Sequence, residues 1–275
     1  MTETFTVTFR GVRGSIASPG PRTARYGGNT PCVEVRCGDR LIIFDGGTGI
    51  RELGDELQAA GKPIDADIFL SHTHIDHISG LAFFAPFYEA AHRFRIWSGH
   101  LASGTNTRSA IERMMSEPIF PITPDAFKAH VEYRDFRAGD TLTPAPHLAL
   151  RTTPLDHPGG ATGYRLDFAG RTLAYLTDNE SGKDTDARLA EFARGADLLI
   201  YDCTYTDDEI TSKTGWGHSA WRDGLRLADA AKVKTFCLFH HAPEHDDACM
   251  DRIVAEASRI RPGTIAAIEG RTIAL

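Results

Sequence analysis

The sequence predicts an α/β protein built from two sheets that helices cover on their outer faces. Both halves of the chain contain several short strand-like segments, with helical segments between and after them. No stretch has the composition of a linker, so we expect residues 1–275 to form a single domain. With 41% hydrophobic and 24% charged residues, the chain can bury a sizeable core.

The first strands follow from alternation and from short apolar runs. Residues 4–9 alternate polar with apolar side chains, as a half-buried strand does. Residues 32–37 and 41–44 are also strand-like, and the second is a continuous apolar run suited to burial. A further short buried strand is expected at residues 68–70.

Helices are expected where apolar residues recur at helical spacing. Residues 50–60 satisfy this spacing, and Gly61 ends the segment. Residues 78–90 are rich in apolar side chains and predict a helix interrupted at Pro86. A shorter helix is expected around residues 111–115.

The second half of the chain repeats the strand-then-turn pattern and ends in helices. Strands are expected at residues 148–152, 161–168, 172–176, 198–201 and 235–239. Helices are expected at residues 184–194, 219–231 and 247–260.

Composition also bears on partners and compartment. A net charge of −7 argues against a broad basic surface for duplex nucleic acid. Five cysteines without a Cys-x-x-Cys pair are typical of reduced thiols. Since we find no signal-peptide pattern and no apolar run of membrane-spanning length, we expect a cytoplasmic protein without a membrane partner.

One cluster of potential metal ligands follows the strand predicted at 68–70. It reads His-x-His-x-Asp-His and contains His72, His74, Asp76 and His77. Residues i and i+2 of a strand point to the same side, so His72 and His74 can converge on one ion. Asp76 and His77 can then reach a second ion. Imidazole with carboxylate suits zinc, manganese or iron, whereas calcium and magnesium favour oxygen ligands.

The alternative for this cluster is a polar helix start, in which Asp76 is a cap and the histidines are solvated. Further potential ligands elsewhere favour the metal site. His157 stands in a predicted turn, Asp178 at a strand end, and His240 and His241 directly after an apolar strand. Each alone has an ordinary explanation, such as a surface turn or a helix cap. Together with the first cluster they complete two sets of ligands.

This ordered pattern resembles the metallo-β-lactamase superfamily, and the resemblance extends over nearly the whole chain as far as His240. It implies an αβ/βα four-layer sandwich with the site at the sheet edges. It implies two divalent metal ions, of which zinc is expected first and manganese or iron are alternatives. The implied ligands are His72, His74 and His157 for the first ion, Asp76, His77 and His240 for the second, and Asp178 as the bridge. His240 is chosen over His241 because it follows the strand directly.

Two segments resemble the phosphodiesterase branch of this superfamily, which contains ribonuclease Z and small cyclic phosphodiesterases. They are Gly-His-Ser at 217–219 and Tyr-Asp-Cys-Thr-Tyr at 201–205. Asp202 stands where ribonuclease Z has Glu, and Ala220 stands where Thr is usual. These departures weaken the match to ribonuclease Z itself.

The resemblance implies hydrolysis of a phosphodiester by a metal-activated hydroxide. Asp76 is then expected to take or relay a proton, and His218, aimed by Asp202, to donate one to the leaving oxygen. The alternative for His218 is a structural role next to Ser219, a good N-cap. Asp45 resembles the family's early Asp-x-Gly turn and is expected to orient the metal loop, with an ordinary turn as its alternative.

A small substrate, such as a cyclic nucleotide or an aryl or alkyl phosphodiester, is expected. Long nucleic acid is not expected, because the chain has no Gly/Pro-rich basic insertion. A carboxyl-ester or lactone hydrolase of the same fold is the main alternative, and a non-enzymatic metal- or RNA-binding module is the second. Dimerisation is common in the fold, so a homodimer is considered as well.

Four arginines and one aromatic residue are candidates for substrate contacts, and five histidines have no predicted role. The arginines are Arg10, Arg13, Arg22 and Arg25, and the aromatic residue is Phe120, a candidate wall over the site within the 99–125 segment. The histidines treated as surface or core residues are His92, His100, His130, His147 and His245.

Overall fold

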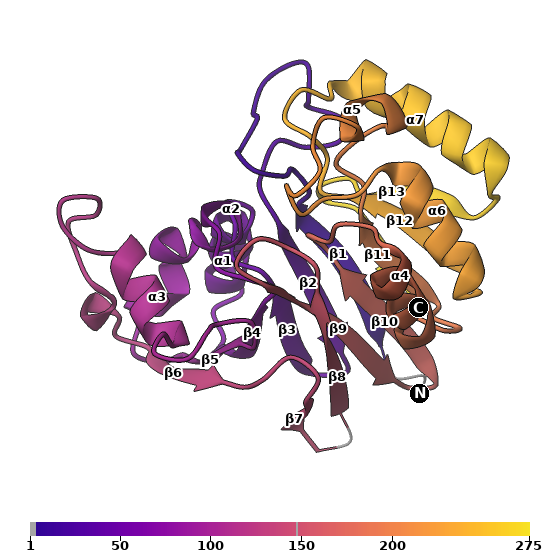
Figure 1. Ribbon diagram of the computed structural model, residues 1–275. Coiled ribbons are helices and arrows are strands. Elements are labelled where there is room, and N and C mark those ends of the chain that lie inside the picture. Colours follow the sequence, from indigo (N-terminus) through magenta and orange to yellow (C-terminus); the bar gives the residue numbers. More distant parts are fainter. Residues whose placement is uncertain (1–3, 147) are drawn as a thin grey trace.

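The computed structural model of the protein describes residues 4–146 and 148–275. Two mixed seven-stranded sheets pack face to face (Figure 1). The first has the strand order β14 (Thr272–Ala274), β1 (Phe5–Gly11), β2 (Cys32–Cys37), β3 (Arg40–Phe44), β4 (Asp65–Leu70), β5 (Arg93–Ser98) and β6 (His130–Asp135). The second has the order β13 (Thr264–Ala266), β12 (Thr235–Phe239), β11 (Leu198–Asp202), β10 (Arg171–Leu176), β9 (Ala161–Phe168), β8 (Leu148–Leu155) and β7 (Thr141–Ala145).

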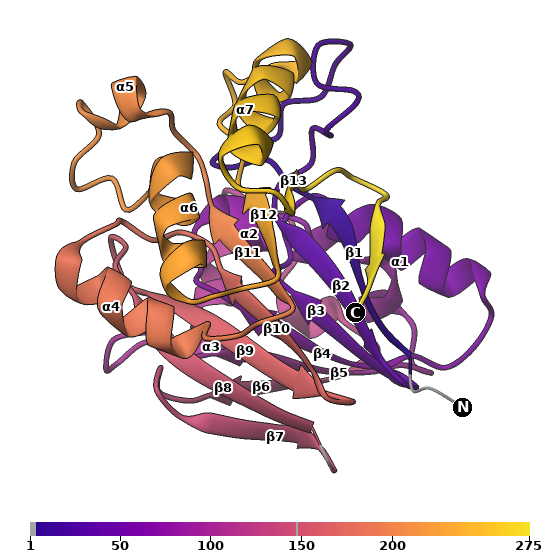
Figure 2. The same ribbon diagram turned by 90° about the vertical axis from the view of Figure 1, so that its right-hand side faces the viewer.

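Helices lie outside both sheets (Figures 1 and 2). On the first sheet these are α1 (Ile50–Ala59), α2 (Ile75–Ile78) and α3 (Thr107–Met114), with 3₁₀ turns η1 (Leu81–Phe83), η2 (Ala85–Tyr88) and η3 (Pro124–Ala126). On the second they are α4 (Lys183–Phe192), α5 (Asp207–Ile210), α6 (Trp221–Ala230) and α7 (Asp247–Ile260). This arrangement confirms the four-layer sandwich. That the whole chain acts as one domain stays a prediction.

The strands that lead into the predicted site are parallel to one another. In the first sheet β3, β4, β5 and β6 are parallel, and in the second β10, β11, β12 and β13 are parallel. The carboxyl ends of parallel strands meet at one edge of a sheet, which is where open α/β sheets place their ligands. The segments that follow β4, β10 and β12 therefore emerge at a common end of the sandwich.

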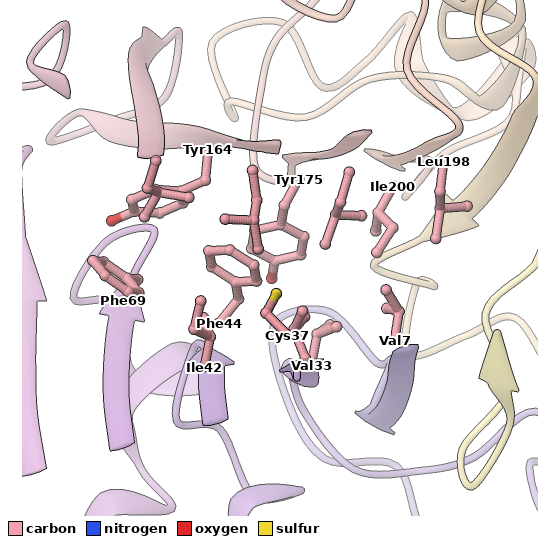
Figure 3. Close-up of a cluster of buried hydrophobic side chains, with 14 of the residues drawn as sticks. Val7, Val33, Cys37, Ile42, Phe44, Phe69, Tyr164, Tyr175, Leu198 and Ile200 are labelled. Atoms are coloured by element: carbon pink, nitrogen blue, oxygen red, sulfur yellow. The ribbon is translucent and has the colours of Figure 1, made fainter. Parts of the chain in front are cut away.

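An aromatic core between the sheets holds this end in place. Figure 3 shows side chains of the two sheets pointing toward one another, Phe44 and Phe69 from one and Tyr164 and Tyr175 from the other. The ring of Phe44 lies 5.2 Å from each tyrosine ring, and all four side chains are fully buried. Tyr175 also donates its hydroxyl proton to Asp45 Oδ2 at 2.7 Å. The core is thus connected directly to the turn after β3.

The helix predicted at residues 78–90 is wrong. The chain forms the four-residue α2 and then the two short 3₁₀ turns. Gly80 packs so closely against the turn after β3 that a Cβ atom there would lie 2.0 Å from the Gly47 carbonyl oxygen. Pro86 then lacks the N–H that a longer helix would need. Close packing and a missing donor together divide the segment.

Several strands lacked a clear pattern in the sequence. β5 is an example, because its Arg95 is buried although arginine normally marks an exposed position. Its guanidinium donates to the buried Asp67 of β4 at 2.7 Å. A buried charge of this kind is acceptable only when it is paired, and the pairing is visible only in three dimensions.

Among the described residues, no helix combines the length and apolar character that crossing a bilayer requires.

Candidate metal centre

The predicted ligands come from four separate segments of the chain and converge at the end of the sandwich. His72 and His74 follow β4, Asp76 and His77 lie in α2, His157 follows β8, Asp178 follows β10, and His240 follows β12. Their potential ligand atoms form two compact groups, in each of which all atoms lie within 4.8 Å of one another.

The first group contains His72, His74 and His157. The rings of His72 and His74 lie 4.4 Å apart, as expected for alternate residues at a strand end. His74 Nδ1 lies 3.0 Å from His157 Nε2. Three imidazoles from two sheets therefore direct nitrogen atoms into one small volume.

The second group contains Asp76, His77, Asp178 and His240. Asp76 Oδ2 lies 3.3 Å from Nε2 of both His77 and His240. Asp178 lies 3.2 Å from His77 Nε2 and 3.3 Å from His240 Nε2.

The position of Asp178 connects the two groups. Besides its contacts within the second group, its Oδ1 lies 3.9 Å from Nε2 of His72 and of His157. The Asp178 carboxylate therefore lies between the imidazole nitrogens of the two groups.

The backbone at these positions adopts an uncommon conformation. Asp45, Asp178 and His240 have φ values of 62°, 58° and 61°, in the left-handed region that non-glycine residues rarely adopt. Such a conformation is unfavourable by about 1–2 kcal/mol and persists only where the surroundings enforce it. Each of these residues stands one or two positions after a parallel strand, so the turn redirects its side chain toward the centre.

Hydrogen bonds orient the imidazoles through the ring nitrogen that faces away from the centre. The Nδ1 contacts are His72 with Ser71 Oγ at 3.1 Å, His77 with Asp45 Oδ2 at 2.9 Å, His157 with the Gly217 carbonyl at 2.7 Å, and His240 with Thr204 Oγ1 at 2.9 Å. Such partners fix the ring and the tautomer of a metal-binding histidine. In all four residues Nε2 is then the nitrogen turned toward the centre.

Asp45 is the most connected of these orienting groups. It is fully buried, and it accepts hydrogen bonds from the backbone N–H of Ser71 at 2.7 Å, from the Ser71 hydroxyl and from Tyr175. Its Oδ2 atom also lies 2.9 Å from Nδ1 of His77. This geometry supports the expected orienting role of Asp45.

Protonation and burial make this cluster suited to divalent cations. Burial, reinforced by the neighbouring His77, lowers the pKa of His72 well below its usual value, and burial also lowers the pKa values of His74 and His157. Although burial opposes ionisation of Asp178, the nearby imidazoles outweigh it and lower the pKa of that carboxyl. His77 differs, because burial opposes its charged form but the carboxylates of Asp178, Asp76 and Asp45 outweigh burial and raise its pKa well above the usual value. Neutral imidazoles and ionised carboxylates are the forms that bind metal, so a metal bound at His77 would displace its proton.

Two buried nitrogens give an independent indication. Nε2 of His72 and Nε2 of His77 are shielded from solvent and form no hydrogen bond among the described residues. His77 Nε2 has the contacts with Asp76 and Asp178 given above, whereas His72 Nε2 lies 3.9 Å from Oδ1 of Asp178, beyond hydrogen-bond distance. A buried polar atom without a partner is unfavourable by about 1–3 kcal/mol, so its partner is expected to be a bound group. The residues present therefore fit the divalent metal ions that the fold implies.

His218 and Asp202 form a pair beside the two groups. His218 Nδ1 lies 2.8 Å from Asp202 Oδ2, and its ring stacks on that of His240 with centroids 4.9 Å apart. Burial disfavours the charged imidazolium, but Asp202, with smaller contributions from Asp178 and Asp76, outweighs it and raises the pKa of His218 to about 9. The side chain can therefore carry a proton at neutral pH.

His218 also faces an open cavity of about 300 Å³. The cavity is lined by Ser15, His74, Ile75, Asp76, Asp178 and His218. A small ester seated here would contact both ligand groups and the His218 imidazole.

Three supporting contacts were not predicted from the sequence. The hydroxyl of Thr204 links Asp202 to His240, and the backbone N–H of Ser15 donates to Asp76 Oδ2 at 2.8 Å. His100, for which no role was expected, also makes such a contact. Its Nε2 lies 3.1 Å from the hydroxyl of Thr73, the residue between His72 and His74. Thr204 stands in the 201–205 segment already singled out, but nothing in the sequence pointed to Ser15 or His100.

His241 is separated from the cluster although it neighbours His240 in sequence. It is fully buried, and its Nε2 contacts the carbonyl of Ala267 at 2.9 Å. Burial lowers the pKa of His241 to about 3, so it is neutral. His147, another histidine expected to have no role, lies outside the described residues.

Most of the arginines considered for phosphate contact are engaged elsewhere. Arg13 is buried and donates to three backbone carbonyls, Arg10 pairs with Glu34, and Arg25 pairs with Asp251. These contacts occupy the three guanidinium groups within the protein, and a contact of any of them with substrate stays a prediction.

Phe120, the candidate wall residue, packs edge to face on an aromatic neighbour, and a role over the site stays a prediction. Its ring lies 5.6 Å from that of Phe83.

Comparisons with known proteins agree with this geometry. The model of the family described as "Beta-lactamase superfamily domain" matches residues 40–241. A ribonuclease Z of Haloarcula marismortui is 22% identical in an alignment that covers 97% of this chain and 95% of that protein. A ribonuclease Z of Brevibacillus brevis is 34% identical over 99 residues, which cover 34% of this chain and 30% of that protein.

Solved structures show the same architecture. The metallo-beta-lactamase fold protein YhfI of Bacillus subtilis superimposes with a TM-score of 0.75 at 21% identity, over 99% of this chain and 100% of that one. A structure described as a new diphosphatase from the PhnP family has a TM-score of 0.71 at 20% identity, over 100% and 98% of the two chains. The chain belongs to the beta-lactamase superfamily and is a metal-dependent hydrolase of the metallo-β-lactamase fold.

Proposed function

We propose that the protein is a binuclear metal-dependent phosphodiesterase that acts on small phosphodiesters, such as a cyclic nucleotide or an aryl or alkyl phosphodiester. The names of the relatives support phosphodiester chemistry in general, since the curated ones are ribonuclease Z enzymes. The restriction to small substrates is inferred from the site.

The two ligand groups suit two neighbouring cations. His72, His74 and His157 would hold one, Asp76, His77 and His240 the other, with Asp178 between them. Two adjacent divalent cations would lower the pKa of a bound water, so that hydroxide is available at neutral pH, and they would neutralise a phosphate oxygen. Zinc is the ion we expect, with manganese or iron as alternatives, because all three accept imidazole and carboxylate ligands.

The observation that carries the proposal is the 2.8 Å contact between His218 Nδ1 and Asp202 at the edge of the ligand groups. Asp202 fixes the ring, so Nε2 of His218 is available to donate a proton to the leaving oxygen of an ester. Asp76 is held by the Ser15 N–H and lines the same cavity, where its carboxylate can accept a proton.

The lining of the site cavity supports a small substrate. Its six residues include two carboxylates and no lysine or arginine. The backbone of a long RNA is normally bound by a series of cationic side chains, which this cavity lacks. A compact phosphodiester needs only the cations and His218.

A substrate panel tests this function directly. The protein is stripped with a chelator, reloaded with zinc, manganese or iron, and assayed on bis-p-nitrophenyl phosphate, cyclic nucleotides, an aryl acetate, an acyl lactone and a precursor tRNA. We expect metal-dependent turnover with the largest kcat/KM on a small phosphodiester. Dominant lactone or acetate turnover would replace the proposal with an ester hydrolase. The absence of metal-dependent turnover of any ester would favour a binding module.

Two further expectations belong with this proposal. The five cysteines are free, and four are buried, which supports a reducing compartment such as the cytoplasm. A homodimer stays a prediction, and light scattering of the purified protein at several concentrations would test it.

A further inference from the structure

A second cavity of about 510 Å³ adjoins the metal centre. It shares Ser15 with the site cavity, and its lining includes Thr204 and Tyr205. Thr204 contacts the ring of His240, and the Tyr205 ring lies 6.0 Å from the ring of His218. A group in this cavity is therefore on the His218 side of the centre, where the leaving oxygen is expected.

An exposed tryptophan forms part of this cavity. Trp216 stands two residues before His218, and 54% of its surface is exposed. An exposed apolar residue alone is common on protein surfaces, but Trp216 lines a cavity that adjoins the metal centre, where its ring is accessible to a ligand.

The segment that carries Trp216 is held in place. The backbone N–H groups of Gly215 and Gly217 each donate to the Glu180 carboxylate at 2.9 Å, and the carbonyl of Gly217 accepts from His157 Nδ1. The indole is thus presented by a backbone tied to a predicted metal ligand. Presenting a side chain in a fixed position reduces the entropy that is lost on binding.

The polar groups of the cavity are arranged around this ring. The Lys213 ammonium lies 4.0 Å from the centroid of Trp216 and forms no ion pair among the described residues. Glu209 is engaged by His245 at 3.0 Å, whereas Glu244 is exposed and free to accept hydrogen bonds. The cavity therefore offers an indole with a cation over one of its faces, and one hydrogen-bond acceptor. A planar ligand that stacks on that face has to displace the ammonium.

We propose that this second cavity binds the leaving-group half of the substrate, and that this half is a nucleoside whose base stacks on Trp216. A nucleobase has the planar face that an indole binds. Its polar edge matches Lys213 and Glu244 better than a plain hydrocarbon ring would. The inference rests on the phosphodiesterase function proposed above, and the same nucleoside chemistry occurs in a small dinucleotide and in single-stranded RNA.

The test compares a dinucleoside monophosphate with two analogues that lack the base on one side or the other. Product analysis shows which half leaves, and removal of that base keeps the leaving oxygen chemically the same. In the wild-type protein we expect kcat/KM to fall about ten- to a hundredfold when the leaving-side base is absent, which corresponds to the stacking of one base. Trp216→Ala is expected to bring the ratio close to one, while Trp216→Phe keeps part of it.

Lys213→Met serves as a second variant, because it removes the ammonium but keeps the length of the side chain. We expect the preference for the base to weaken without disappearing. Ile260→Ala is the control, since Ile260 is an exposed apolar residue at the far end of α7, and it should retain both activity and preference.

A parallel arm uses a short single-stranded RNA with the same nucleotide on the leaving side. Loss of base preference in Trp216→Ala with the dinucleotide supports a small nucleotide as the source, and loss with the RNA alone supports a nucleic acid. Unchanged preference with both substrates would overturn the inference and leave the phosphodiesterase proposal intact.

Equilibrium calorimetry with adenosine, and with ribose as the control ligand, tests the cavity without turnover. Binding of adenosine but not ribose, abolished in Trp216→Ala, would support the nucleoside cavity even if every phosphodiester failed as a substrate. Equal behaviour of the wild-type protein and Trp216→Ala toward adenosine would overturn it.

Discussion

Asp202 Oδ2 lies 2.8 Å from His218 Nδ1 in the interior of the protein. The other oxygen of the same carboxylate accepts from the Thr204 hydroxyl at 2.7 Å, and that hydroxyl is 2.9 Å from Nδ1 of His240. One buried carboxylate thus positions both a candidate proton donor and a candidate metal ligand.

His218→Ala is expected to lower kcat by about a hundred- to ten-thousandfold, the usual contribution of general acid catalysis. Metal content should stay near that of the wild type, since the two ligand groups are complete without His218. Steady-state kinetics and elemental analysis on the same preparation give both values. Loss of both metals in this variant would show that His218 is a ligand or a structural residue.

Thr204→Val is expected to lower metal affinity about ten- to a hundredfold, as removal of an orienting partner commonly does. The hydroxyl that links Asp202 to His240 is lost, while Asp202 keeps its contact with His218. Competition with a chromophoric chelator measures the affinity. Thr211→Val, at an exposed position, is the matched control. Wild-type affinity in Thr204→Val would exclude the hydroxyl as a necessary support.

His240→Ala and His241→Ala form a pair of neighbouring substitutions with opposite expected results. His240 faces the second ligand group, so its loss should lower the metal stoichiometry. The His241 side chain contacts the Ala267 carbonyl and the Tyr26 ring and belongs to neither ligand group, so its loss should keep the metals but lower the free energy of unfolding by about 1–3 kcal/mol. Elemental analysis and urea denaturation of the metal-loaded proteins distinguish the two. Reversed metal contents would move the ligand assignment to His241.

Glu269 predicts a pH dependence of stability. Burial raises its pKa to about 7, although hydrogen bonds from Asn29 act in the opposite direction. The folded state therefore binds more protons than the unfolded state between about pH 4.3 and 7, and this side chain destabilises the fold progressively as pH rises through that window. Glu269→Gln cannot ionise.

We therefore expect the free energy of unfolding of Glu269→Gln, relative to that of the wild type, to rise by about 1–2 kcal/mol from pH 4.5 to pH 8. This value is reduced because the carboxyl is partly exposed to solvent. Denaturant unfolding at both pH values measures the gain. Glu117→Gln is the control, because Glu117 is exposed and should show no such difference. A gain for Glu269→Gln that does not change with pH would contradict the expected titration.

The regular elements were largely predictable because their periodicity is local. The strands at 32–37, 161–168 and 235–239 and the helix at 247–260 have the predicted bounds. The divided segment after α2 was not predictable, because its shape depends on the contact between Gly80 and the turn at Gly47. Local pattern does not contain that contact.

The order and type of the predicted ligands could be read from the chain, because imidazole and carboxylate chemistry is a property of the residues themselves. The sequence does not show which ring nitrogen of each histidine faces the metal centre. That depends on partners far away in sequence, such as Asp45 for His77 and Thr204 for His240.

The sequence established the superfamily resemblance, the sandwich and the candidate ligands, because strand spacing and ligand chemistry are encoded locally. Only the packing of the two sheets brought the ends of four strands and the helix α2 into two groups of donors and placed His241 outside them. It also set Trp216 beside His218 as an exposed ring on a fixed segment. The physical reason is that distances between side chains remote in sequence are set by how the layers stack, and no periodicity within a segment specifies them.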